Sequence, residues 1–198
     1  MMNYIEIKTG AVISHVELAA RHPAVCLPET PDLPWLTMQG LAPLREPPAP
    51  DSAPFGHEVA RKPPAPVSNG WWEAGWQFVP LPREKVLEAV CARINAWRSE
   101  QERGGFWWNG CLWDSDPVSV QRITSIGAAG LAPPSGYWTN AHNEDIPVDL
   151  DGMRALYLAM LQRGSEIHDR QREMKQALAA LSFDELLAFQ PGWEDAAA

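Results

Sequence analysis

The clearest pattern in this chain is a row of hydrophobic positions at helical spacing in its second half. The row follows Pro82 and consists of Val86, Val90, Ile94 and Trp97. Leu87 and Cys91 lie beside this row, and Gly104-Gly105 follows the next polar segment. The pattern predicts an amphipathic helix that begins near residue 82 and ends at the two glycines.

An aromatic segment with strand-like alternation follows these glycines. Phe106-Trp107-Trp108 and Cys111-Leu112-Trp113 flank an Asn-Gly pair. Asn-Gly favours the tight turn of a two-stranded hairpin. Adjacent strand residues point to opposite faces, so one of Trp107 and Trp108 is expected to lie outside the local core and to be available for an interface.

Two further helices are predicted on either side of a loop at residues 139–147. The first begins at Asp116-Pro117, a capping carboxylate before a proline, and ends at Gly130. The second is capped by Asp149 or Asp151 and runs to about Leu181, roughly 45 Å. Ser182 and Glu185 form a capping box for a last short helix, after which Trp193 is expected to dock back.

The long helix carries a stripe with a seven-residue repeat: Met153, Met160, Ile167 and Met174. The second position that a coiled coil needs is poor, because Arg163 and Gly164 occupy it midway. Gly164 also weakens the helix by about 1 kcal/mol relative to Ala. Two interpretations stay open: the stripe packs within its own domain, or it pairs with a copy of the chain.

The first part of the chain has a different character. Residues 1–22 predict a β hairpin around Thr9-Gly10, and residues 69–81 predict a Trp-rich hairpin with turns at Asn69-Gly70 and Ala74-Gly75. Residues 23–68 contain most of the 19 prolines. Proline fixes φ and removes a donor, so this segment is expected to be an extended arm without helix or central strand. It is either a linker or an arm that lies on a neighbouring subunit.

These segments together predict an α+β chain: small N-terminal β hairpins with an extended Pro-rich arm, then a mainly helical domain. That domain, residues 82–193, has an inserted aromatic hairpin and one long helix, and residues 194–198 form a tail. The candidate partner contacts are exposed aromatic residues and prolines of the arm. They are Trp35, Trp71, Trp72, Trp107, Trp108, Pro47, Pro48, Pro63 and Pro64. The alternative for the tryptophans is that half or more of them form the core.

Composition narrows the possible partners. The net charge is −9 and no basic stripe is present, so nucleic acid is not expected as a partner. No apolar run is long enough to span a membrane, and no signal peptide is expected in MMNYIEIKTG. Three widely spaced cysteines, Cys26, Cys91 and Cys111, favour free, mostly buried thiols in a protein made in a reducing cytoplasm.

Candidate chemistry is sparse. Asp114-Ser115-Asp116 lacks the Gly and the distal Glu of a calcium loop, and a capping role explains Asp116 better. The polar run from His142 to Asp145 has no partner at metal-ligand spacing. No catalytic residue, metal or cofactor is therefore predicted, and the chain is not expected to be an enzyme.

A series of landmarks in the second half resembles a C-terminal domain of unknown function found in tailed-phage tail, tail-fibre and tail-fibre-assembly proteins. The landmarks are Arg98, Gly104-Gly105-Phe106, Asn109-Gly110, Asp114-Ser115-Asp116, Gln121, Trp138-Thr139 and His142-Asn143, followed by the two helices. The resemblance covers about residues 82–193 and implies no enzymatic activity.

The resemblance implies a structural component of a bacteriophage tail, either a tail fibre or a protein that attaches fibre to baseplate. Its partners would be other tail or fibre subunits, with a homotrimer or homodimer as a further possibility, and it would be made in the host cytoplasm and reside in the virion. The alternative function is a tail-fibre assembly chaperone, and a tail-associated hydrolase is a distant third.

Overall fold

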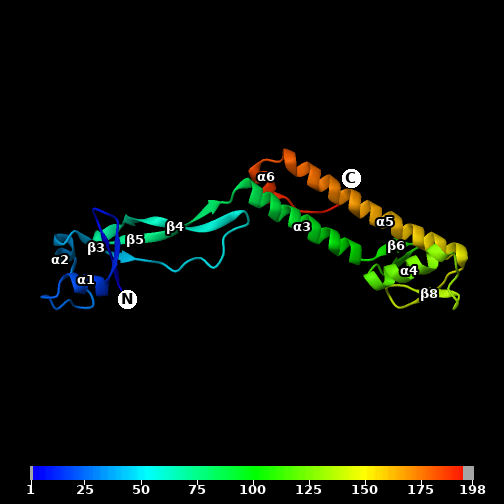
Figure 1. Cartoon of the computed structure of the whole chain (residues 1–198), viewed down its shortest axis with the longest axis horizontal. Coiled ribbons are helices and arrows are strands. Elements are labelled where there is room, and N and C mark those ends of the chain that lie inside the picture. The colour runs from blue at the N-terminus through cyan, green and yellow to red at the C-terminus, as the bar shows by residue number, and fades with distance from the viewer. Residues whose placement is uncertain (1, 194–198) are drawn as a thin grey trace. The chain divides into compact units, whose positions relative to one another are not determined.

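The computed structural model describes residues 2–193, and the expected tail at 194–198 lies outside this range. The chain is α+β, as expected, and divides after Leu81 into two compact units. In the first unit the elements are β1 (Asn3–Glu6), β2 (Val12–Ser14), α1 (His15–Arg21), α2 (Leu33–Met38), β3 (Leu41–Arg45), β4 (His57–Pro66) and β5 (Trp72–Pro80). In the second they are α3 (Arg83–Arg103), β6 (Phe106–Trp108), β7 (Cys111–Trp113), α4 (Pro117–Ala129), β8 (Tyr137–Thr139), β9 (Asp145–Pro147), α5 (Leu150–Ala177) and α6 (Phe183–Ala188) (Figure 1).

The first unit is built on a five-stranded sheet with the order β2-β1-β3-β5-β4. All neighbouring strands are antiparallel except β3 and β5. The predicted hairpin at the N-terminus is present, but its second strand ends at Ser14, because Ser14 and Glu17 form a capping box that starts α1. The core beneath this end of the sheet consists of Tyr4, Ile13, Leu18, Leu36 and Leu41.

The prediction that residues 23–68 form an extended arm is wrong. The segment contributes a helix, α2, and two strands, of which β3 lies in the middle of the sheet. Pro43 is tolerated there because β3 pairs with β5 only at Leu44 and Arg45, so the position of Pro43 is bonded to β1 alone. Pro47 is also held by the unit, since Trp76 donates its indole N–H to the Pro47 carbonyl at 3.0 Å.

Three further prolines of the segment, Pro63, Pro64 and Pro66, lie in β4, the edge strand of the sheet. Pro63 and Pro64 fall at an irregularity in the β4–β5 register, between Lys62 and Ala65. Proline without an N–H is suited to such an edge, where it discourages further strand pairing. These prolines therefore have a structural explanation within the sheet.

The predicted hairpin at residues 69–81 is also wrong in its arrangement. Asn69-Gly70 does form a turn with positive φ at both residues, but it joins β4 to β5. Ala74-Gly75 is not a turn, because β5 runs straight through it and Gly75 pairs with Lys62. The partner strand thus comes from the proline-rich segment upstream.

The second unit follows its local sequence signals closely. The predicted stripe Val86, Val90, Ile94 and Trp97 is buried on α3. The Asn109-Gly110 hairpin forms β6–β7, and Asp116 caps α4 with hydrogen bonds from Val118 N and Ser119 N. Asp149 caps α5, and the capping box at Ser182 starts α6. The segment expected to be a loop at 139–147 differs, since β8 and β9 pair across it.

The seven-residue stripe of α5 is buried inside this unit. Met153, Met160, Ile167 and Met174 are each at most 8% exposed. In Figure 1, α3 and α5 lie side by side, and α4 packs on the first half of α5. The stripe therefore forms the core of its own unit, and its suggested role in self-association is wrong for the folded chain.

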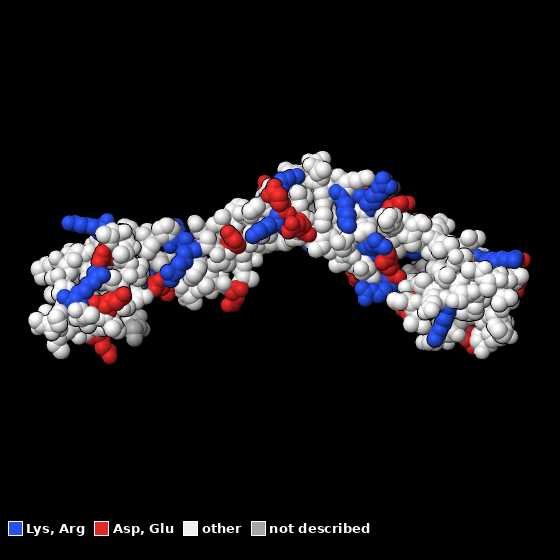
Figure 2. Space-filling view, in the orientation of Figure 1, with Lys and Arg blue, Asp and Glu red and all other residues white. Residues whose placement is uncertain are grey.

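Two surface properties complete the description. On the face shown in Figure 2, acidic and basic side chains are intermingled over each unit. Within residues 2–193, no helix combines the length and apolar character needed to cross a membrane. The expectation of mostly buried thiols is wrong: the cysteines are free, but Cys26 is exposed, and Cys91 and Cys111 are half-buried.

Two glycines provide a direct test of the packing around α5. A Cβ on Gly127 of α4 would lie 2.6 Å from Cβ of Tyr157 on α5. We expect Gly127→Ala to lower the melting temperature, because overpacking costs about 1–3 kcal/mol and exceeds the helix-propensity gain of about 1 kcal/mol. Thermal unfolding followed by circular dichroism of the full chain measures the shift.

Gly164→Ala is the matched control. Nothing lies within 4 Å of the added methyl group, so this change should raise the melting temperature by helix propensity alone. Equal shifts for the two variants would contradict the contact between α4 and α5.

Candidate functional site

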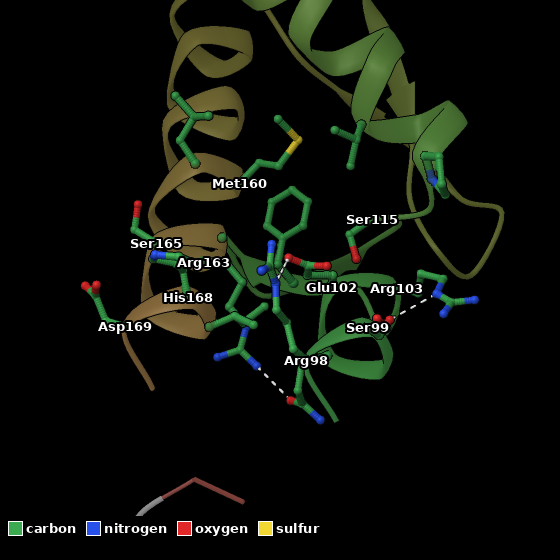
Figure 3. Close-up of a pocket in the computed structure, with 17 residues that line it drawn as sticks. Arg98, Ser99, Glu102, Arg103, Ser115, Met160, Arg163, Ser165, His168 and Asp169 are labelled. Carbon is green, nitrogen blue, oxygen red and sulfur yellow. Dashed lines mark hydrogen bonds and ion pairs between the residues drawn. The ribbon is translucent and has the colours of Figure 1, made fainter. Parts of the chain in front are cut away.

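The second unit has a groove of about 740 Å³ between the C-terminal half of α3, the middle of α5 and the start of α4 (Figure 3). Apolar side chains from three elements form its floor: Phe106, Val120, Met160 and Ile167. Phe106, Met160 and Ile167 are also buried core residues. The floor is therefore fixed by the packing of the unit.

The α3 wall of the groove is charged. Arg98, Ser99, Glu102 and Arg103 lie within little more than one turn, which places them on neighbouring parts of the helix surface. Arg98 Nε donates to Glu102 Oε1 at 2.7 Å, and its Nη1 donates to the buried Gln171 at 3.2 Å. Arg103 Nε donates to the Ser99 carbonyl at 3.0 Å. In Figure 3, Glu102 lies in the middle of the groove, whereas the Arg103 guanidinium points to the side away from α5.

The α5 wall combines apolar and small residues with the charged Arg163 and Asp169. Four of its residues lie on one face of the helix, because they are spaced by three or four positions: Leu161, Gly164, Ser165 and His168. Leu161 is 45% exposed. Gly164 leaves the backbone of α5 uncovered, since an added Cβ would meet nothing within 4 Å. The groove is thus open directly above the helix at this point.

The C-terminal end of the described chain docks on residues that line the groove. Trp193 Nε1 donates to Gln101 Oε1 at 2.8 Å, and the Arg163 guanidinium lies 4.3 Å from the Trp193 ring centre. Trp97 packs edge-on against the same ring at 5.2 Å. The prediction that Trp193 docks back is therefore confirmed, and it docks on two residues that line the groove.

The entrance near α4 depends on a tight backbone turn. Gly105 has φ +83°, and a Cβ there would lie 2.8 Å from the Trp113 carbonyl oxygen. Gly105 N donates to Ser115 Oγ at 2.8 Å, which holds Ser115 at the rim. Asp116 follows, and hydrogen bonds from Ser119 and from the Val118 N–H lower the pKa of its carboxyl.

The aromatic hairpin forms a second hollow of about 460 Å³ beside the groove. Phe106 and Arg163 line both hollows. Trp107 is 71% exposed at the second hollow, whereas Phe106 and Trp113 are buried. The expectation that one of the adjacent tryptophans lies outside the core is confirmed, and Trp107 is that residue.

The other predicted contact residues are distributed over the two units. Trp108 packs on Trp113 at 5.8 Å between ring centres, so it belongs to the hairpin core. Trp35 meets His22 edge-on at 5.2 Å, Trp71 lies beneath Arg45 at 5.5 Å, and Trp72 is half-buried in β5. Trp35, Trp71, Trp72 and the four prolines belong to the first unit, whereas Trp107 and Trp108 belong to the second and line the same hollow.

The sequence did not identify the arginines of the groove as a group. Arg98 and Arg103 come from α3 and Arg163 from α5, so only the folded unit brings them together. One sequence signal for the groove was Gly164, because a glycine lowers the stability of a long helix and no neighbouring atom requires one at this position.

The polar motifs of the sequence have structural roles. Asn140 is buried, and its Oδ1 accepts hydrogen bonds from the N–H groups of His142 and Glu144, which shapes the turn between β8 and β9. Over residues 2–193, no three His, Cys, Asp or Glu side chains gather in a way that could hold a metal ion.

The fold and the groove define a helical unit with an inserted aromatic hairpin and an open, arginine-lined surface. A family model described as "Domain of unknown function (DUF4376)" matches residues 85–196, more than half of the chain. The chain belongs to this family. No curated protein and no solved structure matches it.

The lowered pKa of Asp116 predicts a pH dependence of stability. Since the folded pKa is below the unfolded value of about 3.9, the ionised cap stabilises the fold above that value, and the contribution is lost as pH falls through the folded pKa. Asp116→Asn keeps a capping oxygen but does not titrate. We expect wild type to melt at a higher temperature than this variant at neutral pH, and the difference to shrink below about pH 4.

Melting temperatures measured by circular dichroism across this pH range test the expectation. Asp169→Asn, which removes an exposed carboxylate from α5, is the control for loss of one charge. A difference for Asp116→Asn that stays constant with pH would contradict the assignment.

Proposed function

We propose that this chain is a structural subunit of a bacteriophage tail, part of a tail fibre or of its attachment to the baseplate, and that it acts through protein–protein contacts. The phage context comes from the resemblance of residues 82–193 to C-terminal domains of tail and tail-fibre proteins. The family to which the chain belongs has no described function, so the phage context is our own inference. The protein would be made in the host cytoplasm and would reside in the virion.

The observation that supports a binding role is the exposure of Trp107. A tryptophan that is 71% exposed keeps a large apolar area in water, and such residues are common anchors at protein interfaces. Trp107 stands on a short hairpin whose other face is fixed by Phe106 and Trp113. A rigid support reduces the entropy lost when a partner covers the ring.

Mass spectrometry of purified phage particles tests the structural role. We expect the protein at a stoichiometric level, because a tail subunit remains in the assembled virion. Its absence from particles, together with its presence in infected cells, would contradict the proposal and favour a tail-fibre assembly chaperone instead.

The role of Trp107 is tested in the same particles. Trp107→Ala should lower the amount of the protein in the virion, because the loss of an aromatic anchor costs about 2 kcal/mol or more of binding. Leu131→Ala is the control, since Leu131 is also exposed, at 60%, but lies outside both hollows. Equal incorporation of wild type and Trp107→Ala would remove Trp107 from the interface.

A further inference from the structure

The second unit contains a further hollow, of about 440 Å³, at the end where β8 and α4 lie (Figure 1). It is enclosed by Asp114 after β7, by the first turns of α4, and by β8 with the turn that follows it. Every residue that lines it except Trp138 carries a hydroxyl, an amide or a charge. We call it the polar hollow, and its volume is within the usual range for small-molecule sites.

The base of the polar hollow is fixed by its own hydrogen bonds. Asn140 lines the hollow and is buried, and its Oδ1 accepts from the N–H groups of His142 and Glu144 at 2.8 and 3.0 Å. The Ala141 N–H donates to the Leu112 carbonyl at 2.9 Å, which ties this turn to β7. The hollow is therefore formed before a ligand enters, which reduces the entropy lost on binding.

Four side chains of the polar hollow carry polar groups that have no hydrogen bond or ion pair within the described part of the chain. Asp114 has none, and Arg122 has only an electrostatic attraction to Asp116. The Asn143 amide and the Tyr137 hydroxyl also make no hydrogen bond there. Asp114 and Arg122 have opposite charges and line one hollow without pairing. The hollow therefore offers separate acceptors and donors whose charges cancel.

The aromatic residues of β8 give the polar hollow an apolar component. Tyr137 is 43% exposed, so much of its ring is in contact with water. Trp138 is half-buried, and it packs against the core of the unit while also lining the hollow. Such side chains combine an apolar ring with a polar tip.

We propose that the polar hollow binds one sugar unit of a neutral saccharide. A sugar hydroxyl both donates and accepts, so neighbouring hydroxyls can donate to the Asp114 carboxylate and accept from the Arg122 guanidinium or the Asn143 amide. The C–H groups of the sugar ring form an apolar face, which suits the rings of Tyr137 and Trp138. A ligand of one charge suits the hollow less, because one of the two opposite charges would repel it.

The proposal goes beyond the proposed function, which assigns a protein partner to Trp107. No residue is shared between the polar hollow and the two hollows beside Arg163. Sugar binding is measured on the purified chain, whereas the proposed function is measured on phage particles. Failure of either measurement therefore leaves the other result unaffected.

Saturation-transfer difference NMR with the full-length chain tests the proposal. The neutral probes are the methyl glycosides of glucose, galactose, mannose and N-acetylglucosamine. We expect at least one of them to bind with a Kd on the order of 1 mM, because a small ligand in an open hollow binds weakly. Glucuronate and glycine serve as an anionic and a zwitterionic probe, and both should bind more weakly than that sugar.

Asp114→Asn places the binding in the polar hollow. Its Kd should be about tenfold higher than that of wild type, because a charge-assisted hydrogen bond from the sugar is lost. Its melting temperature should stay unchanged, since Asp114 has no hydrogen bond or ion pair to lose within the described residues. Asp169→Asn removes an exposed carboxylate outside the polar hollow, and it should change Kd by about twofold at most.

The aromatic contribution is tested at Tyr137, which is exposed and therefore tolerates substitution without loss of the core. Tyr137→Ala should raise Kd about threefold to tenfold, because the sugar loses an aromatic face.

Three results would overturn the proposal. In the first, no neutral sugar shows saturation transfer at about 10 mM, tenfold above the expected Kd. In the second, Asp114→Asn binds the sugar as tightly as wild type does. In the third, glucuronate or glycine binds more tightly than every neutral sugar, which would assign the polar hollow to a charged ligand.

Discussion

The second unit depends on the burial of one stripe of α5. α3, the β6–β7 hairpin and α4 cover this stripe, which consists of Met153, Met160, Ile167 and Met174. The packing thereby determines which faces of α5 are exposed to solvent. A buried stripe cannot serve a partner at the same time, since exposing it would cost the hydrophobic stabilisation of the unit. Any contact between α5 and another protein therefore uses its remaining faces, which include the exposed Leu158 and Leu161.

The second unit was largely predictable because its local signals agree with its tertiary packing. The Asn-Gly turn, the carboxylate caps at Asp116 and Asp149 and the capping box at Ser182 each define an element boundary within a few residues. Such signals need no knowledge of distant residues. The β8–β9 pair was missed because its strands have three residues each, too few for a period to be recognised.

The first unit was not predictable from the same rules, because the effect of a proline depends on which strand lies beside it. A missing N–H destabilises a sheet only where a neighbouring strand would accept from it. β5 pairs with β3 only at Leu44 and Arg45, so no residue of β5 is paired with Pro43. Pro63 and Pro64 lie in β4, which is an edge strand of the sheet. Proline content indicated the extended backbone of β3 and β4, but it showed neither that these strands are paired nor that α2 forms.

The candidate site shows the same limit, since Arg103 and Gly164 are 61 positions apart in the sequence and line one groove only because α3 packs on α5. The sequence revealed the helical cost of Gly164, and the structure shows the open space that accompanies it. Arg163 connects these features, because it lines the groove and the Trp107 hollow and covers the Trp193 ring. The groove, the hollow beside the aromatic hairpin and the docked Trp193 therefore share one side chain.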